Sequence, residues 1–326
     1  MRFPGLASGR GPRLTVCIPA YRAGRFIERT VDSVRTQSFR DWRIVIANDG
    51  GHDREAIDRL GGIPNLDIVH HEARLGWREN ANWLIRRVRT PYFAILPHDD
   101  EILPDYYAAM LDLLEGRPNA FCACSAIQTV GLAEDRVVSW KPVTGTQMER
   151  IEQVLTGAWE AVGFRAVNRR VGDNRALTIP ATRSGDMFAD SAWTMRQALR
   201  GDMLFDTRPL YVKHFHDANT HMGWYSEDPG TIARAWYVYC LKMGWLASLA
   251  VRSGEERSRI RLLAMRRVFG TGGAGRPANI RRVVDEAWSE DRQAALKIRF
   301  RETLRRAVRM RGLRRWGFLP PGLCGW

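Results

Sequence analysis

The chain contains 326 residues, 45% of them hydrophobic and 26% charged, which is the composition of a soluble globular protein. This length allows one large domain or two ordinary ones with a sizeable buried core. Its five cysteines show no zinc-site spacing, which argues against a structural zinc centre and indicates buried thiols in a reducing compartment.

The positive charge is concentrated in one part of the chain. Residues 231–326 hold 21 of the 50 Lys and Arg residues and 7 of the 36 Asp and Glu residues, so they carry the whole net charge of +14. A neutral body and a basic C-terminal region are therefore expected. Residues 1–12 lack the apolar core of a signal peptide, and Arg234 and Lys242 interrupt the apolar window at 232–251. We expect a cytoplasmic protein.

Short runs of branched and aromatic residues alternate along the chain with segments of helical spacing. The runs predict strands at residues 14–18, 42–47, 66–69, 92–96 and 120–127, and the spacing predicts helices near residues 26–36, 78–88 and 104–114. This alternation is typical of a parallel, doubly wound α/β sheet.

Polar side chains follow three of these strands at the point where each strand ends. They are Tyr21 with Arg22, Asn48 with Asp49, and Asp99 with Asp100. Ligands of doubly wound sheets bind in the crevice beyond the carboxyl ends of the strands. We therefore expect the three clusters to converge on one crevice.

The third cluster is strongly acidic. After Pro97, which ends the strand, come His98, Asp99, Asp100 and Glu101. Carboxylates repel one another, whereas Mg²⁺ and Mn²⁺ prefer carboxylate oxygens and keep positions open for phosphate. The cluster is interpreted either as a metal site or as a solvated acidic turn that caps the next helix.

The order of the motifs resembles that of the family 2 glycosyltransferases with the GT-A fold, from residue 14 to residue 220. The matching motifs are Pro-Ala-Tyr at 19–21, Asn-Asp-Gly-Gly-x-Asp at 48–53, Arg78 with Asn80, His-Asp-Asp at 98–100, Asp190 and His216. The resemblance implies a nucleotide-diphospho-sugar transferase on a GT-A-type, doubly wound and mostly parallel sheet that is flanked by helices.

The resemblance also implies a role for each matching residue. The nucleotide-sugar donor would be bound by Pro19, Tyr21, Asn48, Asp49, Arg78, Asn80, His98, Asp99 and Asp100. Asp99 and His216 would hold Mg²⁺ or Mn²⁺. Asp190 would be the catalytic base of an inverting displacement, with Asp186 as the alternative base.

Four residues depart from the family's usual pattern. Asn48 replaces an aspartate, Pro97 replaces the first acid of Asp-x-Asp, Ala189 replaces a glutamate, and His214 lies where arginine is common. An amide at position 48 still forms hydrogen bonds to a nucleobase, although it removes a charge. None of the four changes deletes a core role, so an active enzyme is expected.

Several of these residues also allow a structural interpretation. Asp190 can be the N-cap of a helix at residues 191–199, and Asp53 the N-cap of a helix from residue 54. His216 can be a surface histidine or one with satisfied hydrogen bonds. Tyr21 can belong to an ordinary turn, and Arg78 to an exposed helix start.

The sequence divides into four regions. They are a tail at residues 1–13, a nucleotide-sugar-binding half at 14–128, an acceptor-side half with the base at 129–230, and a basic helical extension at 231–326.

Two stretches of the later regions bear on the acceptor. Residues 163–186, on the acceptor side, are rich in Gly, Arg and Asn and are expected to form a mobile loop. In the extension, Leu296, Phe300 and Leu304 form an apolar stripe flanked by arginines. This stripe suits packing on the body, or peripheral contact with the anionic inner face of a membrane that carries a lipid-linked acceptor.

The expected function is metal-dependent, inverting transfer of a hexose in polysaccharide biosynthesis. The donor would be a UDP-, GDP- or dTDP-linked sugar, and the acceptor a hydroxyl of a saccharide or of a lipid-linked molecule. A nucleotidyltransferase on a similar sheet is one alternative, although residues 19–24 are a poor version of its glycine-rich phosphate loop. A non-catalytic binder of nucleic acid or of an anionic surface is another, but it leaves the acidic clusters unexplained, and no nucleic-acid-reading motif is found.

Overall fold

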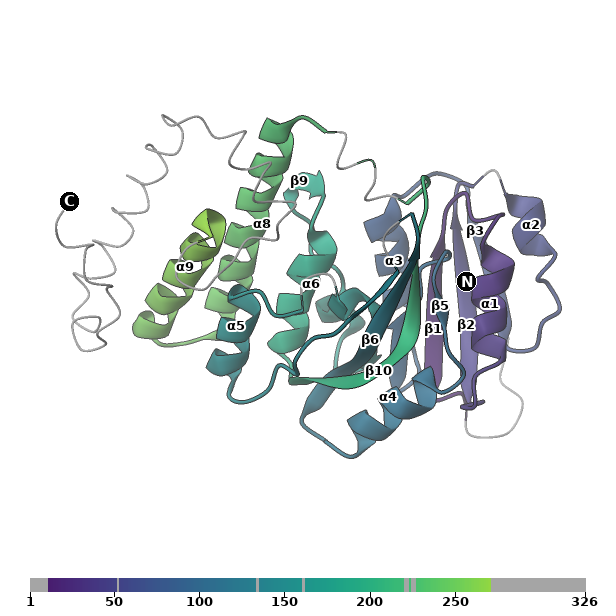
Figure 1. The fold of residues 1–326 in the computed structure, drawn as a ribbon, viewed down its shortest axis with the longest axis horizontal. Helices are drawn as coiled ribbons and strands as arrows, with labels where there is room; N and C mark the ends of the chain where they lie inside the picture. Colours follow the sequence, from purple (N-terminus) through teal and green to yellow (C-terminus); the bar gives the residue numbers. More distant parts are fainter. Residues whose placement is uncertain are drawn as a thin grey trace.

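The computed structural model describes residues 11–51, 53–132, 135–159, 162–219, 223 and 227–270. Within them, one nine-stranded sheet has the order β3-β2-β1-β4-β8-β6-β10-β5, and β7 pairs with β6 (Figure 1). Helices flank this sheet, and helices α8 and α9 lie at the end of the molecule opposite β3 (Figure 1). The prediction of a mostly parallel α/β sheet flanked by helices is confirmed.

The first four strands form the parallel half of the sheet. Strand β1 spans Leu14–Ala20, β2 Trp42–Asp49, β3 Leu66–His71 and β4 Tyr92–Ile95, and the intervening helices are α1 (Ile27–Arg35), α2 (Arg54–Asp58) and α3 (Trp77–Ile85). In the register of the sheet, Ala20 lies beside Asn48 and Asn48 beside His70. The carboxyl ends of β1, β2 and β3 are therefore level, which brings the polar residues that follow them to one edge.

The second half of the sheet is mixed. Its strands are β5 (Glu101–Ile102), β6 (Ala120–Gly131), β7 (Arg136–Val138), β8 (Val167–Arg169) and β10 (Asp202–Phe215), and helix α4 (Tyr106–Glu115) precedes β6. Strand β10 runs parallel to β6, whereas β8 is antiparallel to both of its neighbours, β4 and β6. The expectation of a loop throughout residues 163–186 was wrong, because β8 lies within it. This short strand is decided by backbone partners on both sides, which the local sequence does not reveal.

Short elements build residues 147–198, part of the region that was predicted to bind the acceptor. They are α5 (Gln147–Leu155), the 3-10 helices η1 (Val162–Arg165) and η2 (Asn174–Leu177), strand β9 (Arg183–Asp186) and α6 (Ala189–Ala198). The buried side chain of Gln197 on α6 donates 2.8 Å to the carbonyl oxygen of Gly163 and 2.7 Å to Oδ1 of Asn168. These bonds attach α6 to η1 and β8.

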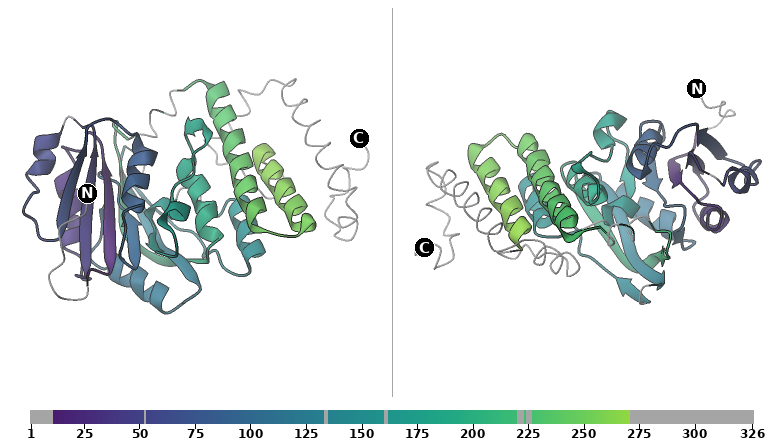
Figure 2. Two further views of the ribbon diagram at one scale, coloured as in Figure 1. Left: turned by 180° about the vertical axis from the view of Figure 1, so that it is seen from behind. Right: turned by 90° about the horizontal axis from the view of Figure 1, so that it is seen from above.

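Two helices continue from the body into the predicted basic extension. Helix α8 spans Pro229–Ala250. Asp228 is its N-cap residue, and the Asp228 carboxylate accepts a hydrogen bond from the backbone N–H of Thr231. Helix α9 spans Gly254–Phe269 and packs beside α8 (Figure 2). Residues 271–326, which include the predicted stripe at Leu296, Phe300 and Leu304, lie outside the described residues.

Two predictions about cellular context can be compared with the described part of the chain. None of its helices combines the length and the apolar character needed to cross a membrane. Cys17, Cys122 and Cys124 are buried, as expected of core thiols, and burial raises the pKa of Cys17 to about 12.

Candidate active site

The acidic loop after β4 is held by elements on both sides of it. Thr30 Oγ1 on α1 lies 2.8 Å from the carbonyl oxygen of His98 and 2.9 Å from that of Asp100. His98 Nδ1 lies 3.2 Å from the carbonyl oxygen of Pro19 on β1, so it donates a hydrogen bond to that oxygen. The loop is therefore fixed to the end of β1 and to α1, and it is not a freely solvated turn.

Asp99 and His216 are in contact although 117 positions separate them in the sequence. Asp99 Oδ2 lies 3.0 Å from His216 Nε2 and accepts a hydrogen bond of 2.8 Å from Asn219 Nδ2. The ring of Phe26 stacks on the imidazole of His216, with the ring centres 4.2 Å apart. Burial acts to raise the pKa of Asp99, but His98, His216 and Asn219 outweigh it and keep that pKa below its ordinary value. The structure therefore assembles an ionised carboxylate and an imidazole at one point.

Asp100 is buried, and its carboxylate joins the loop after β4 to β10 and η1. Its Oδ2 accepts hydrogen bonds from the Tyr211 hydroxyl at 2.8 Å and from Arg165 Nε at 3.3 Å, and its Oδ1 accepts one from the His214 backbone N–H at 3.2 Å. The residue is 2% exposed, and burial raises the pKa of its carboxyl group although Arg165 opposes this effect. Because both oxygens are engaged by protein groups, the geometry favours a positioning role over direct contact with a sugar.

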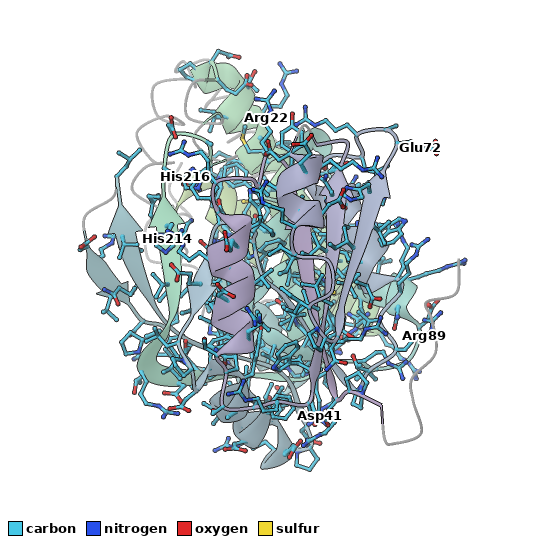
Figure 3. All side chains as sticks on the ribbon, turned by 90° about the vertical axis from the view of Figure 1, so that its right-hand side faces the viewer. Arg22, Asp41, Glu72, Arg89, His214 and His216 are labelled. Atoms are coloured by element: carbon cyan, nitrogen blue, oxygen red, sulfur yellow. The ribbon has the colours of Figure 1, made fainter. Side chains whose placement is uncertain are left out.

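His214 is the last but one residue of β10, and His216 directly follows the strand (Figure 3). His214, which lies where the family commonly has arginine, has its Nε2 atom 2.6 Å from Oε1 of Glu101. The same oxygen of Glu101 lies 2.9 Å from Nε of Arg29 on α1. His214 therefore belongs to a polar cluster that joins β10, β5 and α1.

Asp190 lies in the first turn of α6. Its Oδ1 accepts a hydrogen bond of 2.8 Å from the backbone N–H of Ser191. The helix begins at Ala189, and Phe188, with a φ of 61°, occupies the N-cap position. The alternative in which Asp190 caps a helix starting at residue 191 was therefore wrong. Its carboxylate belongs to the helix turn and gains from the positive end of the helix dipole.

Two cations that the sequence analysis missed lie near Asp190. Burial raises the pKa of Asp190, while the Ser191 N–H, Arg165 and Lys213 oppose that rise. Burial lowers the pKa of Lys213 to about 8, and the charge of Arg165 adds to this effect. Alternation along β10 places Lys213 on the same strand face as Tyr211, which is a usable sequence signal. Arg165 carries no such signal, because it lies in the stretch interpreted as a loop.

Asp49 and Asn80 hold the backbone at the ends of β1 and β2. Asp49 accepts hydrogen bonds from the backbone N–H groups of Leu75, at 2.5 Å, and Gly76, at 2.9 Å. Asn80 Nδ2 donates 2.8 Å to the carbonyl oxygen of Ala47. Both side chains are almost fully buried. They fix the start of α3 against β2 at this edge of the sheet.

Among the described residues, the side chain of Asn48 forms a hydrogen bond through its nitrogen but not through its oxygen. His70 Nε2 lies 2.8 Å from Asp58 Oδ1 and donates to it, so His70 Nδ1 accepts the hydrogen bond of 3.0 Å from Asn48 Nδ2. Oδ1 of Asn48 is buried and has no hydrogen-bond partner among the described residues. A Cβ atom on Gly51 would lie 2.3 Å from this oxygen, so only glycine fits beside it.

The turn after β1 carries Tyr21 between arginines. The guanidinium of Arg74 lies 4.2 Å from the centre of the Tyr21 ring, and that of Arg22 lies 5.3 Å from it. Asp53 occupies the N-cap position of α2 but makes no capping hydrogen bond. Its carboxylate instead accepts one of 3.0 Å from the Gly24 backbone N–H, which ties the turn to α2.

Arg78 is paired within the protein. Its Nε donates to Asp186 Oδ1 on β9, and one of its terminal nitrogens donates to Glu79 Oε1, both at 2.5 Å. Its side chain is only 14% exposed, so the alternative of an exposed helix start was wrong. The pair connects α3 with β9, and so joins a predicted donor-binding residue to the predicted alternative base.

The residues at Asp99 fit a hard divalent cation that shares its coordination with a substrate. His216 Nδ1 is buried and has no hydrogen-bond partner among the described residues, so this imidazole is not satisfied at both nitrogens. The described residues contain no group of three or more His, Cys, Asp or Glu side chains placed to hold a metal ion. Mg²⁺ commonly takes one or two protein carboxylates and completes its shell with water and substrate phosphate. Asp99 and His216 offer that kind of partial donor set.

Comparison with known proteins gives matches to glycosyltransferases. The family model described as glycosyl transferase family 2 matches residues 15–175. A putative teichuronic acid biosynthesis glycosyltransferase of Bacillus subtilis, TuaG, is 30% identical over 113 residues, which are 34% of this chain and 45% of that protein. An uncharacterised glycosyltransferase of Rickettsia typhi is 24% identical over 33% of this chain and 34% of its own length. The chain thus spans less than half the length of either relative.

Two solved structures share the fold. TarS of S. aureus (residues 1–349), in complex with UDP-GlcNAc, has a TM-score of 0.58 at 12% identity, and the match covers 84% of this chain and 91% of that one. A mannosyltransferase of Pyrobaculum calidifontis, in complex with GDP-Man and Mn²⁺, has a TM-score of 0.51 at 15% identity, covering 91% of this chain and 86% of that one. At these identities the likeness shows the fold alone.

Proposed function

This chain belongs to glycosyl transferase family 2 through residues 15–175, and from that premise we propose that it catalyses metal-dependent, inverting transfer of a hexose. The donor is a nucleotide-diphosphate sugar, and the acceptor is a hydroxyl of a saccharide or of a lipid-linked molecule. The observation that carries the proposal is the Asp99–His216 contact at the end of β4, with a second carboxylate, Asp190, in the first turn of α6.

The chemistry proposed for Asp190 is that of a general base. The acceptor oxygen forms a bond to the anomeric carbon as the bond from that carbon to the diphosphate breaks, and Asp190 takes the hydroxyl proton. One displacement inverts the anomeric configuration. Burial supports this role because it raises the pKa of Asp190 and makes the carboxylate a stronger base, while Arg165 and Lys213 limit that rise.

The donor side is proposed to lie along the carboxyl ends of β1, β2 and β4. Asn48 offers its unpartnered Oδ1 to a donor N–H of the nucleobase, and Tyr21 offers a ring beside the base. Asp99 and His216 would hold Mg²⁺ or Mn²⁺, which when bound stabilises the negative charge that develops on the leaving diphosphate. Asp100 keeps the loop in place through Tyr211.

The remaining donor-binding assignments are more indirect. Asp49 and Asn80 would hold the backbone that faces the nucleotide. His98 and Pro19 would act through the hydrogen bond between them. Arg78 would exchange its partner Asp186 for a phosphate of the donor. The name of TuaG and the ligands of TarS and of the mannosyltransferase support a nucleotide-sugar donor and a role in polysaccharide synthesis. The buried thiols support a cytoplasmic location.

A donor screen tests the proposal. Purified protein is incubated with UDP-, GDP- and dTDP-linked hexoses, with Mn²⁺, Mg²⁺ or chelator, and release of the nucleoside diphosphate is measured. We expect slow, metal-dependent hydrolysis of one donor that is lost in Asp99→Ala and retained in Asp112→Ala, which changes an exposed aspartate on α4. If calorimetry detects no binding of any nucleotide sugar with metal present, the proposal is wrong.

The base is tested with the donor that the screen identifies. Asp190→Asn should keep donor affinity and lower transfer by about 100-fold or more, the range of general-base catalysis. Asp186→Asn is the matched control, because it changes the alternative base four residues earlier in the chain. A larger loss in Asp186→Asn than in Asp190→Asn would reverse the assignment.

A further inference from the structure

Helix α8 exposes an apolar stripe on the side that faces away from the body. Leu241, Trp245 and Leu249 are 38%, 53% and 66% exposed, and their spacing of four residues places them on one face of the helix. They are three of the eight large hydrophobic side chains that are exposed in the described part of the chain. The other five are not on this helix, so the stripe is a local concentration of exposed apolar surface.

The body does not need this stripe for its own packing. The inner face of α8 already buries Trp236, Tyr239, Met243 and Ala247, and α8 packs against α6 and α9. A helix of a soluble protein normally places polar side chains on the face opposite its buried one. Exposed apolar surface of this kind commonly marks a contact with a partner or with a membrane.

One lysine contacts the stripe, and exposed arginines precede and follow it along the chain. Lys242 Nζ lies 4.3 Å from the centre of the Trp245 ring, and the exposed residues Arg234 and Arg252 flank the stripe along the chain on either side. Residues 231–270 hold eight Lys and Arg residues against two acidic ones, and of these eight Arg267 is buried and Arg259 is paired with Glu152. A second copy of the chain would bring the same excess of positive charge to this face, whereas an anionic surface complements it.

We propose that the α8 stripe, defined as Leu241, Trp245 and Leu249, seats the protein on an anionic lipid bilayer. The apolar side chains enter the interface, where tryptophan is favoured, and the flanking cations contact lipid headgroups. Helix α8 packs on α6, which carries Asp190, so the bilayer lies on the acceptor side of the crevice. The membrane contact itself does not depend on the proposed function. Its benefit for catalysis, which is access to a lipid-linked acceptor, does rest on that function.

Vesicle flotation tests the contact without any measurement of activity. The full chain is floated with vesicles of phosphatidylcholine, alone or with about a third phosphatidylglycerol. We expect recovery with the anionic vesicles only, and a loss of apparent affinity of roughly tenfold or more in the double variant Trp245→Ser/Leu249→Ser. The control is Leu132→Ser/Val171→Ser, which removes two comparably exposed side chains from the body and should float like the unchanged protein. Thermal unfolding establishes that both variants fold.

Three results would overturn the proposal. The stripe variant could float as well as the unchanged chain, which would assign any membrane contact to another surface. Neutral and anionic vesicles could bind equally, which would remove the role of the cations. Sedimentation could reveal a dimer that the stripe variant dissociates, which would assign the face to a second copy of the chain. None of these results depends on whether the protein transfers a sugar.

Discussion

Replacing Lys213 by methionine should stabilise the fold at neutral pH. Burial lowers the pKa of Lys213 from 10.5 to about 8. Below pH 8 the folded protein therefore contains a buried charge, which lowers its free energy of unfolding. A displacement of this size corresponds to about 3 kcal/mol at 1.36 kcal/mol per pKa unit. Contact with water at the partly exposed side chain reduces the expected gain in unfolding free energy to about 1–2 kcal/mol at pH 7.

The free energy of unfolding should depend on pH, because the pKa of Lys213 differs between the folded and the unfolded state. The unfolded chain keeps the Lys213 proton up to about pH 10.5, whereas the folded protein releases it at about pH 8. Between these values the unfolded state binds more protons, so the contribution of Lys213 to the unfolding free energy rises with pH. Above pH 10.5 the cost of the charge is absent, and below pH 8 it is present in full.

Urea unfolding at pH 7 and at pH 9.5 measures both effects. Lys213→Met should be more stable than the unchanged protein at pH 7, and the difference should shrink at pH 9.5. Lys213→Arg is the matched control, because arginine stays charged at both pH values. This variant should therefore lack the gain in stability that deprotonation of Lys213 gives the unchanged protein. A Lys213→Met variant that is less stable at pH 7, or a difference that does not change with pH, would refute the reasoning.

Three further changes have defined outcomes. Arg165→Met leaves the buried carboxyl of Asp100 without its cation, so urea unfolding should show a loss of about 3–5 kcal/mol, and an unchanged midpoint would contradict the pairing. Thr30→Val removes the hydroxyl shared by two carbonyl oxygens of the loop after β4; a loss of about 1–3 kcal/mol is expected, and Thr36→Val at the exposed end of α1 is the control. Gly51→Ala places a Cβ against Oδ1 of Asn48, so calorimetry should show weaker donor binding, and an unchanged donor affinity would contradict this close approach.

Much of the site's location could be predicted, because strand ends of a parallel sheet meet at one edge. The polar residues after β1, β2 and β4 follow runs that are apolar enough to be read as strands. The contact between Asp99 and His216 also agrees with the order of motifs, although their role in metal binding stays a prediction. The roles of Asp49 and Asn80 could not be read in this way, since a polar side chain after a strand can face a ligand or hold the backbone.

The order of the motifs indicated the family, and the residues alone predicted the fold class and the edge of the sheet at which chemistry would be found. These follow from local periodicity and from residue types at strand ends, both of which are written along the chain. Only the tertiary structure decided that β8 enters the sheet, that Asp100 is braced by Tyr211 and Arg165, and that Lys213 lies near Asp190. The reason is physical: these outcomes depend on contacts between distant residues and on the burial that those contacts create, and neither has a local signature.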